Sequence, residues 1–245
     1  MRDIFKGFAL AVSMLTTLPF FRVHDFSKGI NGYAVMFYPL VGFILGAILW
    51  GIHELLNPYI PHAHLGIIIF GMLIFLTGAL HLDGLSDTID GMYAPKERAL
   101  EVMKEPHVGA MGMIFTATFL LLKASTLAVF DAFYLLPLVL MLSRFNAVLA
   151  IYLYPYVSPN GMSSFAKNEL KKVQVLAATF YVILFGMWAL GLWSFVLMFA
   201  SVLVLFVIKL YFVKRYGGFT GDIYGFTIEI TELILLNSIL IIGIS

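Results

Sequence analysis

The sequence predicts an all-α, polytopic membrane protein, and three observations support this fold class. Hydrophobic residues make up 61% of the 245 residues, whereas charged residues make up only 12%. The mean hydropathy is +0.97, and soluble domains are only about half apolar and about a quarter charged. The apolar residues also fall into runs long enough to cross a hydrocarbon layer of roughly 30 Å as helices. We expect one domain over residues 1–245 with about seven transmembrane helices.

Seven apolar runs mark the expected membrane-spanning helices. They lie at 33–56, 64–82, 109–130, 134–154, 173–190, 192–213 and 224–244. The stretch 4–20 is also apolar, but basic residues flank both of its ends and would need the same side of the membrane. For this stretch we expect a re-entrant or interfacial helix rather than an eighth crossing.

Basic residues fall in alternate connections between these runs. The connections around 57–63, 131–133 and 190–192 contain no lysine or arginine, and neither does the C-terminal end. The positive-inside rule then predicts an inside N-terminus and an outside C-terminus in the cell membrane. The basic residues that define the inside connections are Arg2, Lys6, Arg22, Lys28, Lys96, Arg98, Lys104, Lys167, Lys171, Lys172, Lys209, Lys214 and Arg215.

The composition excludes several classes of function. The chain has no cysteine, so it can form no disulfide, thiolate metal site or cysteine nucleophile. A formal net charge of +1 argues against a nucleic-acid-binding surface. We expect no cleaved signal peptide, because no small-residue cleavage site follows the first apolar stretch.

The main chemical motif is His-Leu-Asp-Gly-Leu-Ser-Asp-Thr-Ile-Asp-Gly at residues 81–91, after the second apolar run. On a helix, Asp83, Asp87 and Asp90 fall within an arc of roughly 60°. Three like charges on one narrow face repel one another, and a divalent cation relieves that repulsion. His81 lies about 160° from this face, so we do not expect it to bind the same metal ion.

Oxygen ligands without cysteine favour Mg²⁺ or Mn²⁺ over zinc. Mg²⁺ typically binds few carboxylates, keeps several waters and bridges substrate phosphates. The motif therefore indicates transfer of a phosphate-containing group at the cytoplasmic face of the membrane.

A second candidate region is the loop that precedes the third apolar run. It mixes basic residues with glycines, and backbone N–H groups at a helix start can bind an anion. A topology-determining basic loop explains the same composition. The candidate substrate-binding residues of this loop are Arg98, Lys104, His107, Gly109 and Gly112.

A third cluster begins the last apolar run. Asp222, Glu229 and Glu232 share a helical face of about 80°. Carboxylates inside a membrane helix cost about 2.5–3.5 kcal/mol each at the bilayer centre, which favours a functional role. The helix dipole accounts for Asp222 but not for the two deeper glutamates.

Two basic residues lie inside apolar runs. We expect Lys123 to reach the interface or to pair with a carboxylate. Arg144 lies closer to mid-span, and it either neutralises a substrate phosphate or holds a glutamate.

These motifs resemble the cobalamin synthase family, whose members are adenosylcobinamide-GDP ribazoletransferases. The resemblance extends over nearly the whole chain, and the motif at 81–91 is its most specific part. The other matching segments are Leu-Thr-Thr-Leu-Pro at 15–19, 103–112, Ser143-Arg144, and Gly-Gly-Phe-Thr-Gly-Asp at 217–222 with the two glutamates that follow.

The resemblance implies an Mg²⁺-dependent enzyme on the cytoplasmic face. Its substrates would be adenosylcobinamide-GDP and α-ribazole or its 5′-phosphate, and GMP would be released. Asp83, Asp87 and Asp90 would bind metal and diphosphate. Asp222, Glu229 and Glu232 would hold a second metal ion or position and deprotonate the nucleophile. Candidate substrate-binding residues are Arg98, Lys104, His107, Gly109, Gly112, Arg144 and Gly221.

Other functions stay open on the sequence alone. Prenyltransferases and CDP-alcohol phosphotransferases also use aspartate-rich magnesium sites, but the latter expect further aspartates that residues 83–112 do not supply. A cation transporter is a third alternative, although we find no inverted repeat. The number of metal ions, the general base and the formation of a homo-oligomer are also left open.

Overall fold

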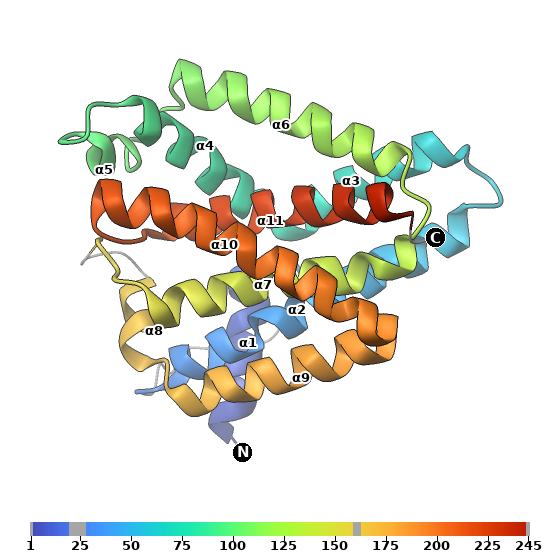
Figure 1. Cartoon of the computed structure of the whole chain (residues 1–245), viewed down its shortest axis with the longest axis horizontal. Coiled ribbons are helices and arrows are strands. Elements are labelled where there is room, and N and C mark those ends of the chain that lie inside the picture. The colour runs from blue at the N-terminus through green and yellow to red at the C-terminus, as the bar shows by residue number, and fades with distance from the viewer. Residues whose placement is uncertain (1, 20–27, 159–162, 244–245) are drawn as a thin grey trace.

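A computed structural model describes residues 2–19, 28–158 and 163–243. Apart from one isolated bridge between Tyr156 and Phe219, these described residues form helices, turns and loops. The all-α prediction is confirmed (Figure 1). The helices are α1 (Arg2–Leu15), α2 (Ile30–Leu56), α3 (His62–Thr77), α4 (Leu80–Tyr93), α5 (Ala99–Val102), α6 (Ala110–Ala128), η1 (Phe133–Leu135), α7 (Leu136–Leu153), α8 (Ser163–Glu169), α9 (Lys172–Leu190), η2 (Gly191–Trp193), α10 (Ser194–Tyr216) and α11 (Gly221–Ile242).

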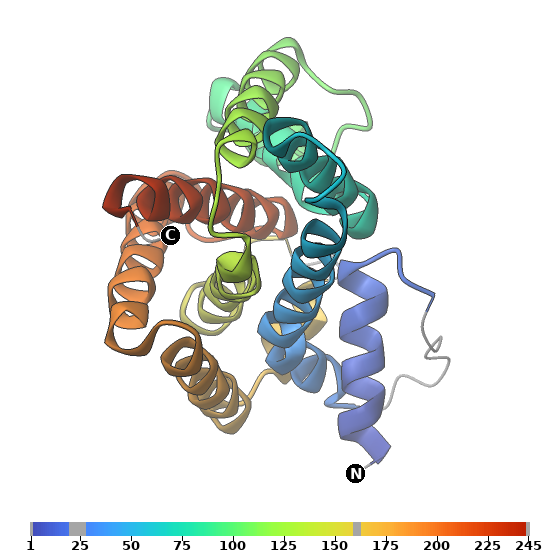
Figure 2. The same ribbon diagram turned by 90° about the vertical axis from the view of Figure 1, so that its right-hand side faces the viewer.

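The helix α7 forms the centre of the bundle. In Figure 2, α2, α9, α10 and α11 surround it. Residues 133–153 are apolar almost without interruption, and 83% of their most hydrophobic window is buried, against 28% for α6. A helix that is hydrophobic all round belongs in a core or a membrane. The outer helices carry exposed large side chains such as Phe180, Trp188 and Phe199, and such a surface suits lipid rather than water.

Within the described residues, five helical segments are long and apolar enough to cross a membrane. A sixth is obtained if α3 and α4 count as one bent span. One of the five, Lys172–Tyr216, contains α9 and α10, which run in opposite directions in Figure 1. The polytopic architecture is confirmed, and the number of seven crossings stays a prediction.

The two ends of the bundle differ in charge as the sequence predicts. In Figure 1 the connections α4–α6, α7–α9 and α10–α11 lie at the left end, and these contain the basic clusters. The connections α2–α3, α6–α7 and α9–α10 lie at the right end together with the C-terminus. The alternation of basic and non-basic connections therefore corresponds to two physical ends of the molecule.

The helix α1 differs in direction from the long helices. It is 14 residues long, about 21 Å at the helical rise, which is shorter than a hydrocarbon layer of roughly 30 Å. It runs crosswise to α2 in Figures 1 and 2. This geometry fits the predicted interfacial or re-entrant helix better than a crossing. The end of the predicted stretch 4–20 and the basic residue Arg22 lie outside the described residues or at their edge.

The predicted second span, 64–82, is wrong as a continuous helix. Helix α3 ends at Thr77, and α4 starts at Leu80 with a bend of 86° between the two axes. Gly78 and Ala79 both adopt left-handed conformations, with φ of 60° and 57°. Two successive left-handed residues end one helix and re-aim the chain. The aspartate motif thus lies on its own helix, turned away from the span that precedes it.

Candidate active site

The three aspartates of the motif lie on one continuous helix, α4, as predicted. Asp83 is in its first turn and is solvent-exposed, whereas Asp87 and Asp90 are partly buried. The charges of Asp83, Asp222 and Asp90 all act on Asp87 and repel its carboxylate. The predicted concentration of negative charge is therefore present, and Asp222, the second residue of α11, adds to it.

Helix α11 brings Asp222 to this cluster because two glycines let it pack closely on α4. A Cβ atom added at Gly84 would lie 2.8 Å from the carbonyl oxygen of Asp222. A Cβ atom at Gly225 would lie 3.2 Å from the carbonyl oxygen of His81. Thr220 caps α11 by accepting a hydrogen bond from the N–H of Ile223 (3.3 Å), and this fixes the turn that presents Asp222.

Substituting alanine for Gly84 is expected to lower kcat/KM by up to about a hundredfold. The new methyl group meets backbone atoms of α11, so the two helices must move apart, and misplacement of about 1 Å at a reacting centre costs this much. Gly51→Ala is a matched control, because a Cβ atom there meets nothing within 4 Å. Equal activity of the two variants in a steady-state assay would show that the close packing is unimportant.

Two cavities meet at Asp83. The first, which we call the polar cavity, has a volume of about 330 Å³ and lies between α4 and the loop before α6. Its lining consists of Asp83, Asp87, Met103, Lys104, Glu105, Pro106 and Val108. It combines three carboxylates, those of Asp83, Asp87 and Glu105, with one lysine, a set of groups that suits a metal ion and a phosphate group.

The second, which we call the apolar cavity, has a volume of about 300 Å³ and lies between α4, α11 and the core helices. Most of its lining is hydrophobic, and its polar end carries Asp83 and Asp222. The residues that line it are Met14, Leu15, Tyr38, Leu80, His81, Asp83, Gly84, Ala147, Ile151, Ser163, Gly221, Asp222, Tyr224, Gly225 and Ile228. Asp83 therefore lies where two ligands of different polarity could meet.

The glycines before the third span do bind an anion, but that anion is Asp90. The N–H of Gly109 donates to Oδ2 of Asp90 (2.7 Å), and the N–H of Gly112 donates to Oδ1 (2.8 Å). The expectation that these N–H groups bind a substrate phosphate is corrected accordingly. The start of α6 has a partial positive charge that Asp90 neutralises within the protein itself.

Replacing Asp90 by alanine is expected to loosen the loop between α4 and α6. Two charge-assisted hydrogen bonds are lost, each worth about 1.5–3 kcal/mol. Trypsin should then cleave after Lys104 about ten times faster than in the unchanged protein. Asp131→Ala, a change of the same kind at the opposite end of the bundle, should leave this rate unchanged. An unaltered rate for Asp90→Ala would mean that the two hydrogen bonds do not order the loop.

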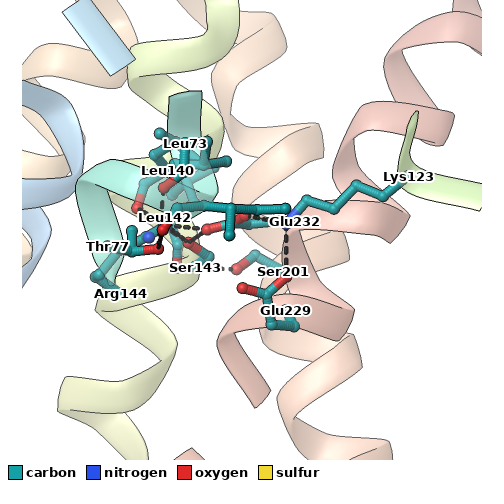
Figure 3. Close-up of polar contacts among 11 residues, drawn as sticks. Leu73, Thr77, Lys123, Leu140, Leu142, Ser143, Arg144, Ser201, Glu229 and Glu232 are labelled. Carbon is teal, nitrogen blue, oxygen red and sulfur yellow. Dashed lines mark hydrogen bonds and ion pairs between the residues drawn. The ribbon is translucent and has the colours of Figure 1, made fainter. Parts of the chain in front are cut away.

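The two deep glutamates of α11 form a buried ion-pair network (Figure 3). The Nζ atom of Lys123 lies 2.6 Å from Oε2 of Glu229 and 2.6 Å from Oε2 of Glu232. Arg144 pairs with the other oxygen of Glu232, which also accepts a hydrogen bond from Ser143 (3.1 Å). Two cations thus balance two carboxylates, and all four charged side chains are almost fully buried.

This network bears on the predicted roles of Arg144, Lys123 and the two glutamates. Arg144 holds a glutamate, the second of its two predicted roles, and only 1% of it is exposed. Lys123 pairs with carboxylates, as one of its two predicted roles required. Glu229 and Glu232 do not line the polar or the apolar cavity, and protein cations already neutralise them. Their predicted contact with metal or nucleophile has no support in this geometry.

The remaining predicted substrate-binding residues are distributed unevenly. Lys104 lines the polar cavity and Gly221 lines the apolar cavity. Arg98 is exposed and pairs loosely with Glu101 and Glu105, with N–O distances of 3.8 Å. His107 is exposed and is absent from the lining of the polar cavity.

Arg215, which the sequence treats only as a topological signal, and Tyr216, which the sequence analysis does not single out, hold the end of the aspartate helix. Arg215 donates to the carbonyl oxygens of Met92 (3.1 Å) and Ala94 (2.9 Å). The hydroxyl of Tyr216 donates to the carbonyl of Gly91 (3.0 Å). These bonds satisfy free carbonyls at the end of α4 and place a positive charge at its negative pole. Nothing in the local sequence indicates this contact, because α10 and α4 are far apart along the chain.

The carboxylates of Asp83 and Asp87 suit Mg²⁺. Within the described ranges, no three histidine or acidic side chains form a ready-made metal cage. Mg²⁺ does not need one, since it usually takes one or two carboxylates and completes its shell with water and substrate phosphate. The two aspartates of α4 in the lining of the polar cavity, beside Lys104, fit that requirement.

The sequence matches known proteins over almost all of its length. The model of the family described as cobalamin-5-phosphate synthase matches residues 7–240. The adenosylcobinamide-GDP ribazoletransferase of Desulforamulus reducens is 36% identical over 246 residues, which cover 97% of each chain. Proteins of the same name from Desulfitobacterium hafniense (32%, 93% of each chain) and Acinetobacter baumannii strain ACICU (34%, 94% of each chain) are also similar. The chain matches no solved structure.

Proposed function

The chain belongs to the cobalamin-5-phosphate synthase family, and we propose that it is an Mg²⁺-dependent adenosylcobinamide-GDP ribazoletransferase of the cell membrane. The transferase activity is the one for which its relatives are named. The position of Asp83 is the main support for placing the active site here. This residue lines both cavities, so it lies where two substrates can meet.

The reaction joins a hydroxyl oxygen of α-ribazole, or of its phosphate, to the phosphorus atom next to cobinamide in adenosylcobinamide-GDP. The bond between that phosphorus and the bridging oxygen breaks, and GMP leaves with the bridging oxygen and its electron pair. The hydroxyl proton must pass to a base. Positioning and charge stabilisation account for most of the catalysis of such a phosphoryl transfer.

Asp83 and Asp87 would hold the metal ion in the polar cavity. When bound, Mg²⁺ would offset the negative charge of the diphosphate and of the departing GMP. Both oxygens of Asp90 accept backbone hydrogen bonds, so we assign this aspartate to anchoring the loop rather than to binding metal. Lys104 supplies a positive charge to the phosphates from the opposite wall of the same cavity.

Asp222 is the carboxylate that we assign as general base. It lines the apolar cavity beside Asp83, and Thr220 donates a hydrogen bond of 3.3 Å to its Oδ2 atom. This leaves Oδ1 available to accept the proton of a hydroxyl group placed between the two aspartates. The glutamates of α11 are less suitable as bases, because their charges are already neutralised by Lys123 and Arg144.

The reaction would occur on the cytoplasmic face of the cell membrane. Helix α4 runs toward the end of the bundle that carries the basic connections (Figure 1), and Lys104 from one of these connections lines the polar cavity together with Asp83 and Asp87. Since basic connections favour the cytoplasm, this end would face the compartment that holds nucleotide substrates.

The purified protein in detergent is expected to release one GMP for each cobalamin formed from adenosylcobinamide-GDP, α-ribazole and Mg²⁺. Chelation with EDTA should stop the reaction, and added Mg²⁺ should restore it. Asp87→Asn should insert into membranes normally but show no turnover. A folded preparation that releases no GMP would refute the transferase assignment, and EDTA-resistant turnover would refute only the metal requirement.

A further inference from the structure

The apolar cavity contains two buried polar side chains whose hydrogen-bonding capacity is unused. Both ring nitrogens of His81 and the hydroxyl oxygen of Tyr224 lack a hydrogen-bond partner among the described residues. His81 is 3% exposed and Tyr224 is 5% exposed. Buried polar atoms without partners are uncommon and costly. Two of them in the lining of one cavity indicate that a ligand supplies their partners.

The residues that line the apolar cavity indicate the chemistry of that ligand. The walls include the aromatic rings of Tyr38 and Tyr224 and the aliphatic side chains of Ile151 and Ile228. Tyr224 is itself held in place by stacking on Tyr156, with ring centroids 6.2 Å apart and planes inclined by 16°. Aromatic and aliphatic walls with a few polar groups favour a flat heteroaromatic ligand that has ring nitrogens.

The size and charge of the cavity argue against two parts of the donor substrate, its corrin ring and its diphosphate. A volume of about 300 Å³ is at the lower limit for small-molecule sites, which is too small for a corrinoid macrocycle. A diphosphate would meet the carboxylates of Asp83 and Asp222 in a lining that contains no lysine or arginine. The polar cavity, with Lys104, suits the diphosphate better.

We propose that the apolar cavity binds the heteroaromatic base of the ribazole acceptor, with His81 and Tyr224 as its hydrogen-bond partners. The ribose then extends toward the polar end, where Asp83 and Asp222 lie. The donor diphosphate occupies the polar cavity on the other side of Asp83. This assignment rests on the proposed transferase function, and it divides the two substrates between the two cavities. The apolar walls also select against bases that carry many polar substituents.

The test compares Tyr224→Phe and His81→Leu with two exposed controls of the same kind, Tyr59→Phe and His64→Leu. Each cavity variant removes hydrogen-bonding atoms but keeps an apolar side chain. We expect the KM for α-ribazole to rise about tenfold for each, the ratio that corresponds to one lost hydrogen bond. The KM for adenosylcobinamide-GDP should change less than about twofold. Titration calorimetry with α-ribazole and Mg²⁺, without the donor, should show the same weakening.

The outcomes separate this inference from the function on which it rests. Failure of the unchanged protein to release GMP refutes the function. Normal turnover of the unchanged protein, with the same KM for α-ribazole in both cavity variants, refutes the assignment of the cavity. A rise in the donor KM alone also refutes it, since the cavity would then belong to the donor. Tyr224→Phe keeps its ring and its stacking partner, so it decides the question even if His81→Leu does not fold.

Discussion

Exchanging Asp83 for asparagine is expected to lower kcat/KM about a thousandfold. The substitution keeps the size and the helical position of the side chain but removes its charge. Asp83 is solvent-exposed and lines both cavities, so the change affects the chemistry and not the packing. Losing one preorganised charge at a phosphoryl-transfer centre typically costs a factor of about 10²–10³. The measurement is GMP release at saturating and at limiting concentrations of each substrate.

Asp131→Asn provides the control for Asp83→Asn, since Asp131 is exposed and lies in the connection between α6 and η1 at the opposite end of the bundle. The control should retain full activity. The Mg²⁺ concentration needed for half-maximal rate should also rise for any residual activity of Asp83→Asn, by about 10–100-fold if Asp83 is a ligand. Nearly unchanged turnover of Asp83→Asn would remove this residue from the site and with it the link between the two cavities.

The sequence predicted where the long helices lie more reliably than where a helix is interrupted by a turn. Apolar runs of about twenty residues place the long helices, because lipid requires every backbone group to bond within its own segment. The turn between α3 and α4 escaped prediction because Gly78 and Ala79 continue an apolar run. Alanine is the strongest helix former, so its left-handed conformation here is imposed by tertiary packing. Tertiary packing of this kind cannot be predicted from the local sequence pattern.

The acidic residues of α11 show that sequence-based prediction has the same weakness at the candidate site. One helical face joins Asp222, Glu229 and Glu232, and on the sequence alone they form one cluster. Ten residues of helix extend about 15 Å, so the two ends of the cluster face different surroundings. Asp222 lines the apolar cavity, whereas Glu232 meets Lys123 and Arg144 from two other helices. Angular position predicts which residues share a face, but the depth of each along the helix decides its partners.

Replacing Lys123 by methionine is expected to destabilise the protein by about 3–5 kcal/mol. The substitution leaves two buried carboxylates with only Arg144 to balance them, and removing one member of a buried ion pair has this cost. The Nζ atom also lies 5.7 Å from the ring centroid of Phe70 and 5.6 Å from that of Phe119, so cation–π attraction is lost as well. Thermal unfolding of the detergent-solubilised protein, followed by circular dichroism, measures the loss.

A second substitution distinguishes charge balance from packing. In Lys123→Met/Glu229→Gln, one cation and one carboxylate remain, and Arg144 pairs with Glu232 as before. We expect the double variant to recover at least half of the lost stability, because the unbalanced charge has gone. Lys209→Met, at a lysine whose Nζ atom lies over the ring of Phe206 in the same helix, should unfold close to the unchanged protein. A double variant less stable than Lys123→Met would mean that Glu229 stabilises the helices through contacts other than its charge. The ion pairs would then follow from the packing of α6, α7 and α11 rather than hold these helices together.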